Sequence, residues 1–332
     1  METLISKSNN PRKHHFLPAS YLRNFCSEKG CLYVYERSKR PRQSIPKSEA
    51  CIRDFYAYED DNGKKFEIEQ ILGQYESAAA PIIQDMIERE QTKQRRLLNS
   101  QEIGILEHFV ALSFERVPAG RRLDEKYVSP AVTKLLTDAA NDPIRFSEMT
   151  KDVPEYEALP ESERAAVIEE TRLRILEGYY DQPEPPGFRL HAMLHVASMI
   201  ADELKKYGCM VIVAPKHENF ITGDTPVVTL TEENGMTQLG TAFIGEKNTV
   251  WFPISSKLCL VWKRGIEPGY ARLPSRGVRM VNRNIMRFSE RFIYAGIYSD
   301  RLRTEFDRTT QQVHFGENAY IPIWEGKPIL EE

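Results

Sequence analysis

The feature that most constrains the fold of this chain is a change of pattern near residue 208. Residues 66–207 carry apolar side chains at three- and four-residue spacing, which is typical of amphipathic helices. Residues 208–300 instead carry short β-branched and aromatic runs between turn residues, which predict strands. Because a further strand is predicted at 31–36, we expect an α+β fold. In this fold a helical middle packs on a mostly antiparallel C-terminal sheet that the N-terminal strand joins.

The same patterns predict the individual elements. We expect helices at 18–25, 68–89, 100–117, 123–140, 161–180, 188–207 and 276–289. We expect strands at 31–36, 209–214, 220–222, 226–230, 250–254, 258–263 and 292–297, with a loop at 37–46. Pro81 should kink its helix or divide it in two, and Ser100 should be the N-cap of the next helix. Together these elements predict one α+β domain over 12–297, helix-rich at 66–207 and strand-rich at 208–300, and a C-terminal extension at 298–332.

Charge and composition argue against several classes of protein. The 332 residues carry a net charge of −3, so there is no global attraction to nucleic acid or to an anionic membrane. Five cysteines without a C-x-x-C pair favour a reducing compartment, and no run approaches the ~20 apolar residues of a membrane helix. No Walker loop, G-x-G-x-x-G or G-x-S-x-G sequence occurs, so ATPase, dinucleotide oxidoreductase and esterase functions lose their usual support. We expect a cytoplasmic protein with no membrane partner, and the sequence identifies no protein partner.

The first candidate site is the segment 14–25, where polar side chains lie among aromatic ones. Pro18 can open a short helix because its missing N–H falls where the first turn has no partner. His15 then precedes this helix as a proton carrier, and Arg23 and Asn24 follow as an anion-binding group and an amide. The alternative is structural: His15 caps the helix or holds a loop, and Arg23 pairs with a surface carboxylate.

The second candidate site is Asp224, in a segment (220–226) that is predicted to be a strand ending in a sharp turn. Gly223 is expected to allow a positive φ angle, and Asp224 is then presented at the strand end, where catalytic carboxylates often lie. The alternative is an Asx turn, in which Asp224 accepts hydrogen bonds from backbone N–H groups ahead of Pro226.

Two predicted helices carry side chains that allow a divalent metal as cofactor. Glu69 and Glu76 lie seven residues apart, as do His108 and Glu115, so two such faces turned together would form a cluster of ligands. Charge pairs on solvated helix faces explain the same residues. Weaker combinations of metal-ligand residues are His191 with His195, and Cys26 and Cys31 with His14 and His15. None completes a metal-site motif, so no metal ligand is assigned and the cofactor stays open.

The third candidate site is a stripe of arginines on the helix predicted at 276–289. At three- and four-residue spacing the stripe contains Arg276, Arg279, Arg283, Arg287 and Arg291. The stretch 276–292 has one acidic residue, Glu290, and a formal charge of +4, which would attract a phosphate backbone or an acidic partner. The alternative is an amphipathic helix whose arginines pair with glutamates of the helical middle.

Several motifs in the same chain order carry a family resemblance. They are His15-Phe16-x-Pro18 with Tyr21-Leu22-Arg23-Asn24-Phe25, Leu32-Tyr33-Val34-Tyr35, Arg116-Val117-Pro118, Phe220-Ile221-Thr222-Gly223-Asp224-Thr225-Pro226 and Val281-Asn282. From about residue 12 to 297 the chain resembles the bacterial and fungal domain-of-unknown-function family numbered 4238. His14 departs from the glutamine more usual in that family, and Gly223 from its usual serine. The resemblance implies a shared fold and shared polar positions, and the family name implies no activity.

The first functional hypothesis is a nuclease-like hydrolase that processes a phosphodiester or a nucleotide. His15 would be the general acid and base, and Asp224 a base or a metal ligand. Arg23 and Arg116 would bind the developing charge of the phosphate, and Asn24 would bind the substrate.

The second hypothesis is a non-catalytic binding module. Its Arg279, Arg283 and Arg287 would contact RNA, DNA or an acidic partner, with an affinity that falls steeply as salt is added. A role in bacterial antiviral defence is compatible with both hypotheses.

Overall fold

The computed structural model of the protein describes residues 12–60, 62–123, 129–150, 156, 158–178, 187–233, 236–239, 247–309 and 317–318. Contacts divide the chain into two compact units, one of Met1–Ala119 with Leu190–Glu332 and one of Gly120–Arg189. The first unit contains all the described strands. One domain over 12–297, and an extension at 298–332, stay predictions.

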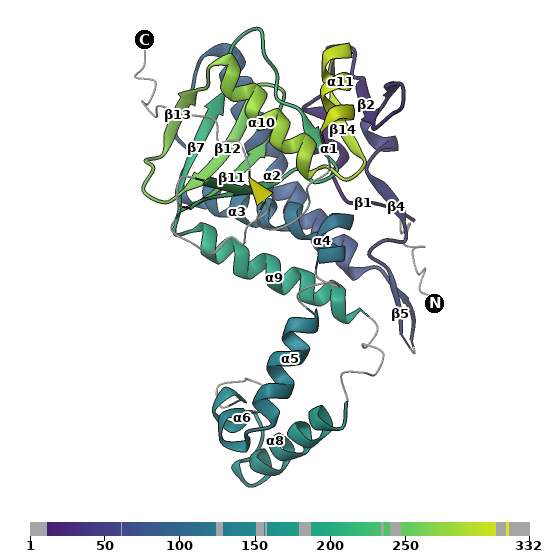
Figure 1. The fold of residues 1–332 in the computed structure, drawn as a ribbon, viewed down its shortest axis with the longest axis vertical. Coiled ribbons are helices and arrows are strands. Elements are labelled where there is room, and N and C mark those ends of the chain that lie inside the picture. The colour runs from purple at the N-terminus through teal and green to yellow at the C-terminus, as the bar shows by residue number, and fades with distance from the viewer. Residues whose placement is uncertain are drawn as a thin grey trace, which may run out of the picture. The chain divides into compact units, whose positions relative to one another are not determined.

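The largest described sheet of the first unit has seven strands, in the order β13-β7-β12-β11-β9-β10-β15 (Figure 1). Their bounds are β7 (Gly208–Val213), β9 (Val228–Glu233), β10 (Met236–Leu239), β11 (Asn248–Pro253), β12 (Leu258–Lys263), β13 (Gly269–Arg272) and β15 (Glu317–Asn318). Every neighbouring pair is antiparallel except β13 and β7, which run parallel. The mostly antiparallel C-terminal sheet is therefore confirmed, although β10, β13 and β15 were not expected.

Both faces of this sheet are buried under helices. Alternate residues of a strand point to opposite faces, and Val211 and Ile212 accordingly belong to two different apolar cores. The core of Val211 includes residues of α2 (Glu67–Thr92), α3 (Ser100–Glu115) and α9 (Phe188–Leu204). The core of Ile212 includes α10 (Ser275–Phe288), which lies on the other face (Figure 1). Because neither face meets water, β7 is apolar at nearly every position.

A second sheet joins the two ends of the chain. Its order is β3-β2-β14-β8, with β2 (Leu32–Glu36), β3 (Arg42–Ser44), β8 (Thr222–Gly223) and β14 (Phe292–Ala295). The N-terminal strand thus pairs with C-terminal strands as expected, although in a separate sheet. The predicted loop at 37–46 is wrong where β3 forms. That short edge strand pairs with β2 through its backbone, which leaves no apolar pattern in the sequence.

Two details of the long helices differ from the predictions. α2 runs through Pro81 as one helix, so the predicted division does not occur; the ring only removes the N–H that would have bonded the Ser77 carbonyl. The N-cap of α3 is Asn99 instead of Ser100. Asn99 Oδ1 accepts from the Glu102 N–H, and the Glu102 carboxylate accepts from the Asn99 N–H, both at 2.9 Å. Asparagine and serine cap helices about equally well, so the sequence could not choose between neighbours.

The remaining described elements are short. In and beside the first unit they are β1 (Lys13–His15), α1 (Ala19–Arg23), η1 (Pro46–Ser48), β4 (Cys51–Arg53), β5 (Tyr58–Asp60), β6 (Gly63–Lys65), α4 (Pro118–Leu123) and α11 (Asp300–Arg308). The second unit contains α5 (Ser129–Ala140), α6 (Pro143–Thr150) and α8 (Glu161–Leu176), which share a small core around Phe146. Across the described stretches, no helix combines the length and the hydropathy needed to cross a membrane.

Candidate functional site

A cavity of about 910 Å³ opens at one edge of the large sheet. It is lined by residues within 23–28, 84–93, 213–216 and 255–258 and by Arg272, and we call it the basic chamber. Its volume falls in the range of ligand sites, roughly 300–1,000 Å³. The chamber is therefore large enough for a small-molecule ligand.

The parallel pair of strands places two parts of the chamber wall together. Val213 and Arg272 are register partners at the ends of β7 and β13, and the Leu273 N–H donates to the Val213 carbonyl at 3.3 Å. Because parallel strands end at the same edge, the residues that follow β7 lie beside Arg272. The β11–β12 hairpin joins this edge through Ser256, whose N–H donates to the Asn24 carbonyl at 3.2 Å.

The lining of the basic chamber is strongly cationic. Of the nineteen described residues that line it, five are lysine or arginine and two are glutamate, a formal charge of +3 in a chain of net charge −3. Four of the cations are exposed, and one of them, Lys93, is paired with Glu90; the other three are Arg23, Lys216 and Arg272. Within the described residues, none of these three side chains forms a hydrogen bond or an ion pair. Their charge is available to an anionic ligand.

Lys257 holds the loop that presents Lys216. Its Nζ donates to the carbonyls of Pro215, Lys216 and Glu218 at 3.4, 3.0 and 2.7 Å. Burial lowers the pKa of this amine from its ordinary value. Lys257 therefore acts mainly as a positioning residue, with its donors directed to the backbone.

Glu90 is neutralised by Lys93, one of the five lining cations, and by Arg95, which does not line the chamber. It therefore leaves the charges of Arg23, Lys216 and Arg272 uncancelled. Although its burial alone would raise its pKa, hydrogen bonds from Arg95 (2.6 Å) and Lys93 (2.6 Å) hold the pKa below the usual value. Glu90 thus stays ionised and bound. Cys26 also lines the chamber, and burial raises the pKa of its thiol to about 11, so this thiol is not a thiolate nucleophile at neutral pH.

A smaller cavity of about 280 Å³ adjoins the basic chamber and shares Arg23, Asn24 and Gln84 with it. We call it the apolar chamber. Its other lining residues are mostly apolar, from α1, α2 and α3: Ser20, Tyr21, Glu76, Ala80, Pro81, Ile83 and Phe109. The Tyr21 hydroxyl bonds Thr222 Oγ1 at 2.8 Å and donates to the Pro253 carbonyl at 2.7 Å, so its ring is fixed in the wall.

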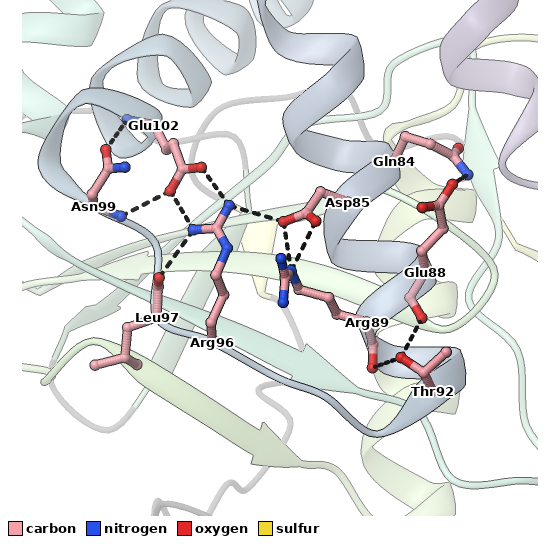
Figure 2. Close-up of polar contacts among 9 residues, drawn as sticks. All are labelled: Gln84, Asp85, Glu88, Arg89, Thr92, Arg96, Leu97, Asn99 and Glu102. Carbon is pink, nitrogen blue, oxygen red and sulfur yellow. Dashed lines mark hydrogen bonds and ion pairs between the residues drawn. The ribbon is translucent and has the colours of Figure 1, made fainter.

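Residues of α2 line both chambers, and polar contacts along this helix hold it in place (Figure 2). The Arg96 guanidinium donates to both oxygens of Glu102, at 2.7 and 2.6 Å, and to Asp85 Oδ2 at 2.8 Å. This network joins the end of α2 to the start of α3. On the same helix Gln84 Nε2 donates to Glu88 Oε1 at 2.9 Å. The amide of Gln84 is therefore held where the two chambers meet.

Of the predicted site residues, the structure brings Arg23 and Asn24 together at both chambers. Asn24 Nδ2 donates to the Ile254 carbonyl at 3.1 Å, which ties the end of α1 to β11. Arg116 lies elsewhere, in the core. Its side chain is 1% exposed and forms an ion pair with Glu76 Oε1 at 2.7 Å. It also donates to the His15 carbonyl.

Arg116 is enclosed further by Tyr56. Arg116 Nε donates to the Tyr56 hydroxyl at 3.4 Å, and this hydroxyl donates back to the Arg116 carbonyl at 2.8 Å. Burial alone would lower the pKa of the guanidinium, but Tyr56 and Glu76 hold it above its ordinary value. The positive charge is therefore permanent and already neutralised by the protein.

His15 and Asp224 have separate sets of partners. His15 Nε2 lies 3.3 Å from the Lys47 carbonyl, and neither residue lines the two chambers. Asp224 is buried, and its carboxylate accepts from the backbone N–H groups of three consecutive residues, Glu290, Arg291 and Phe292, at 2.8, 2.7 and 2.8 Å. Burial nevertheless raises the pKa of Asp224 to about 6, against the effect of these donors.

Gly223 is needed for close packing and not for a positive φ angle, which corrects the expectation. A Cβ at this position would lie 1.9 Å from Ser289 Oγ, at the end of α10. Gly223 is not among the described glycines with positive φ. The tight turn brings Asp224 up to the N–H groups that follow Ser289.

The arginine stripe is largely occupied by protein partners. Arg279 Nη1 lies 2.5 Å from Glu218, Arg283 Nη2 lies 2.8 Å from Glu305, and Arg291 Nε lies 2.9 Å from Glu36. These acids come from outside the helical middle, which corrects the predicted origin of the partners. Arg287 is buried instead of lying on a solvated face. Arg276 is exposed.

The residues considered for a metal have other contacts. His108 Nδ1 lies 2.9 Å from the Gly104 carbonyl, Glu76 pairs with Arg116, and His191 Nε2 lies 3.6 Å from Glu67. Among the described residues, no three His, Cys, Asp or Glu side chains are grouped so that they could hold a metal ion.

Sequence reasoning missed Lys216, Lys257 and Arg272. Each is a single cation without a surrounding motif. A weak signal existed, since Lys216 follows the predicted strand 209–214, and Lys257 lies between two predicted strands. Arg272 belongs to a strand that was not predicted at all.

Fold and cavity together define an α+β protein with a basic chamber of ligand size at the edge of its main sheet. The chain belongs to the family described as protein of unknown function, DUF4238, which it matches over residues 13–298. No curated protein and no solved structure matches the chain.

Proposed function

We propose that this protein binds a phosphate-bearing ligand, a nucleotide or another phosphate ester, in the basic chamber. The observation that carries the proposal is the set of three exposed cations, Arg23, Lys216 and Arg272, which have no ion-pair partner among the described residues and surround one cavity of about 910 Å³. Arginine binds phosphate oxygens in a bidentate manner, and lysine binds them as a point charge. The acids that line the chamber do not pair with these three side chains.

Hydrolysis of the ligand, with His15 and Asp224 as catalytic residues, has less support than binding. Neither side chain lines the chamber, and the Asp224 carboxylate is already bound to three backbone N–H groups. Binding by the arginine stripe also has less support, because three of its arginines pair with acids of the same chain. A cytoplasmic location and a role in antiviral defence stay predictions.

The experiment is titration calorimetry of the purified chain with ATP, AMP and a ten-nucleotide single-stranded RNA, at two salt concentrations and with or without Mg²⁺. We expect binding of at least one of the three. Replacing Lys216 and Arg272 together by alanine should weaken it by about 100-fold, on the order of tenfold for each cation. Release of inorganic phosphate or of RNA fragments in the same samples would report hydrolysis.

The matched control is the double variant Arg40→Ala with Lys47→Ala, which removes two exposed cations outside the chamber. It should bind like the wild-type chain. Equal weakening by both double variants would indicate nonspecific attraction and contradict the proposal. Absence of any binding to the wild-type chain would contradict it as well.

A further inference from the structure

The adjoining chambers suggest that the ligand has two chemically different parts. We propose that the apolar chamber takes the base of a nucleotide whose phosphates lie in the basic chamber. This inference rests on the proposed function and narrows it to nucleoside phosphates. It follows from the shared lining of the two cavities, which places an apolar space of about 280 Å³ directly beside a cationic one.

The walls of the apolar chamber suit a flat ring. Tyr21 and Phe109 supply aromatic rings that meet edge-on, with centroids 6.5 Å and planes 61° apart. One face of Tyr21 is covered by Phe252, on which it is stacked, and its hydroxyl bonds fix the ring. Ala80 and Pro81 of α2 add short side chains. Bases bind proteins by stacking on such side chains, and the contact tolerates every base because each has a π face.

Polar groups lie where the edge of a base would come. Asn24 and Gln84 line both chambers, and each uses its amide nitrogen for a contact within the protein. In the described part of the chain their amide oxygens accept no hydrogen bond, so they are acceptors for the exocyclic or ring N–H groups of a base. An alkyl chain would leave the oxygen of the half-buried Asn24 without a partner.

The position of Arg23 sets the orientation in which a nucleotide would bind. Arg23 is exposed and lines both chambers, whereas Lys216 and Arg272 line the basic chamber alone. A nucleotide placed with its base among the aromatic rings would bring its first phosphate to Arg23 and the following ones toward Lys216 and Arg272. Each phosphate of the nucleotide would then lie near one of the cations that line the basic chamber.

The test compares ATP, GTP, CTP and UTP with inorganic tripolyphosphate, which has the phosphates without the base. We expect the tightest nucleotide to bind at least tenfold more strongly than tripolyphosphate. Ala80→Leu, which fills the apolar chamber, should weaken nucleotide binding about tenfold or more and leave tripolyphosphate binding unchanged. Ala78→Leu is the matched control, because Ala78 is exposed on the same helix and lines neither chamber.

The outcomes separate this inference from the proposed function. If tripolyphosphate binds as tightly as every nucleotide and Ala80→Leu changes nothing, the base does not occupy the apolar chamber, while phosphate binding stands. If neither tripolyphosphate nor any nucleotide binds the wild-type chain, both proposals fail. Should Ala80→Leu fail to fold, photolabelling of the wild-type chain with 8-azido-ATP decides. Label in the peptides of residues 20–24 or 80–84 supports the inference, and label only elsewhere overturns it.

Discussion

Arg116 and Arg23 differ in how far the protein itself satisfies their guanidinium groups. Arg116 is 1% exposed and is bound to Glu76, to Tyr56 and to the His15 carbonyl. Arg23 is exposed at the junction of two cavities and has no such partner within the described residues. The two arginines are therefore not two halves of one phosphate-binding clamp. The first is built into the fold, and the second is available to a ligand.

The same difference separates Asp224 from the cations of the basic chamber. A buried charge must be paired and hydrogen-bonded, since leaving water costs it several kcal/mol. The Asp224 carboxylate meets this requirement through three backbone N–H groups and so joins the turn after Gly223 to the start of β14. A charged group whose hydrogen bonds are all made within the protein, such as Asp224, stabilises the fold. A charged group without a partner in the protein, such as Arg23, can bind a ligand.

The largest effect should come from Arg116→Ala. Removing the guanidinium leaves Glu76 and the His15 carbonyl without their partner, and we expect a loss of about 3–5 kcal/mol in the free energy of unfolding. Urea denaturation followed by circular dichroism measures it. Arg116→Lys should lose less, because it keeps the charge. A loss below about 1 kcal/mol for Arg116→Ala would mean that this arginine is not structural.

Asp224→Ala should cost about 3 kcal/mol, because three buried N–H groups lose a charged acceptor. Asp224→Asn should cost less, since it retains one acceptor oxygen. The same urea titration measures both variants. A structural role for Asp224 would be contradicted if Asp224→Asn folds with unchanged stability and abolishes a hydrolytic activity. Asp224 would then be catalytic, as the first functional hypothesis has it.

These two residues also show how far the sequence alone can lead. Periodicity predicted the long helices and several strands of the main sheet, because apolar spacing follows directly from burial. A structural role for Asp224 was expected only as a local Asx turn, whereas its carboxylate accepts from N–H groups 66 to 68 residues away. Whether the guanidinium of an arginine finds partners within the protein depends on residues that are distant in the sequence. Arg116 meets a carbonyl 101 residues away, and no spacing rule contains such a contact. The chamber likewise forms from five separate segments, so Lys216 and Arg272 carried no motif.

Glu107 should make stability fall as the pH rises. It is a buried carboxyl on α3, and burial raises its pKa to about 7, with Lys205 opposing. Between the ordinary carboxyl pKa and pH 7 the folded chain then holds more protons than the unfolded chain, so the free energy of unfolding decreases with pH across this interval. The change in the free energy of unfolding across the interval is about 3 kcal/mol, and the contribution is constant above and below the interval.

Glu107→Gln isolates this effect from those of Asp224 and Glu69, whose pKa values burial also raises, to about 6 and about 7. Urea titrations from pH 4.5 to pH 7.5 should show a smaller decline for the variant than for the wild-type chain. Parallel curves for the two proteins would mean that Glu107 does not titrate in this range.

Arg283→Ala tests a paired surface arginine and should cost about 0.5 kcal/mol or less. Its partner Glu305 lies 2.8 Å away, but 46% of the arginine side chain is exposed and solvent screens the pair. A double-mutant cycle with Glu305→Ala measures the coupling. Ligand binding should be unchanged. A steep loss of RNA affinity in Arg283→Ala would favour the arginine stripe as the binding surface.

Arg23→Ala should have the smallest effect on stability and a large one on binding. Because the guanidinium forms no hydrogen bond or ion pair with the described residues, its removal leaves no buried group unpaired, and we expect a change within about 0.5 kcal/mol. Affinity for a nucleotide should fall about tenfold, since Arg23 lines both chambers. Arg23→Lys should recover only part of this loss, because an ammonium cannot bind a phosphate in a bidentate manner. Thermal unfolding and calorimetry on the same samples separate the two quantities. A variant that loses several kcal/mol of stability would make Arg23 a structural residue like Arg116, and the contrast between the two regions would disappear.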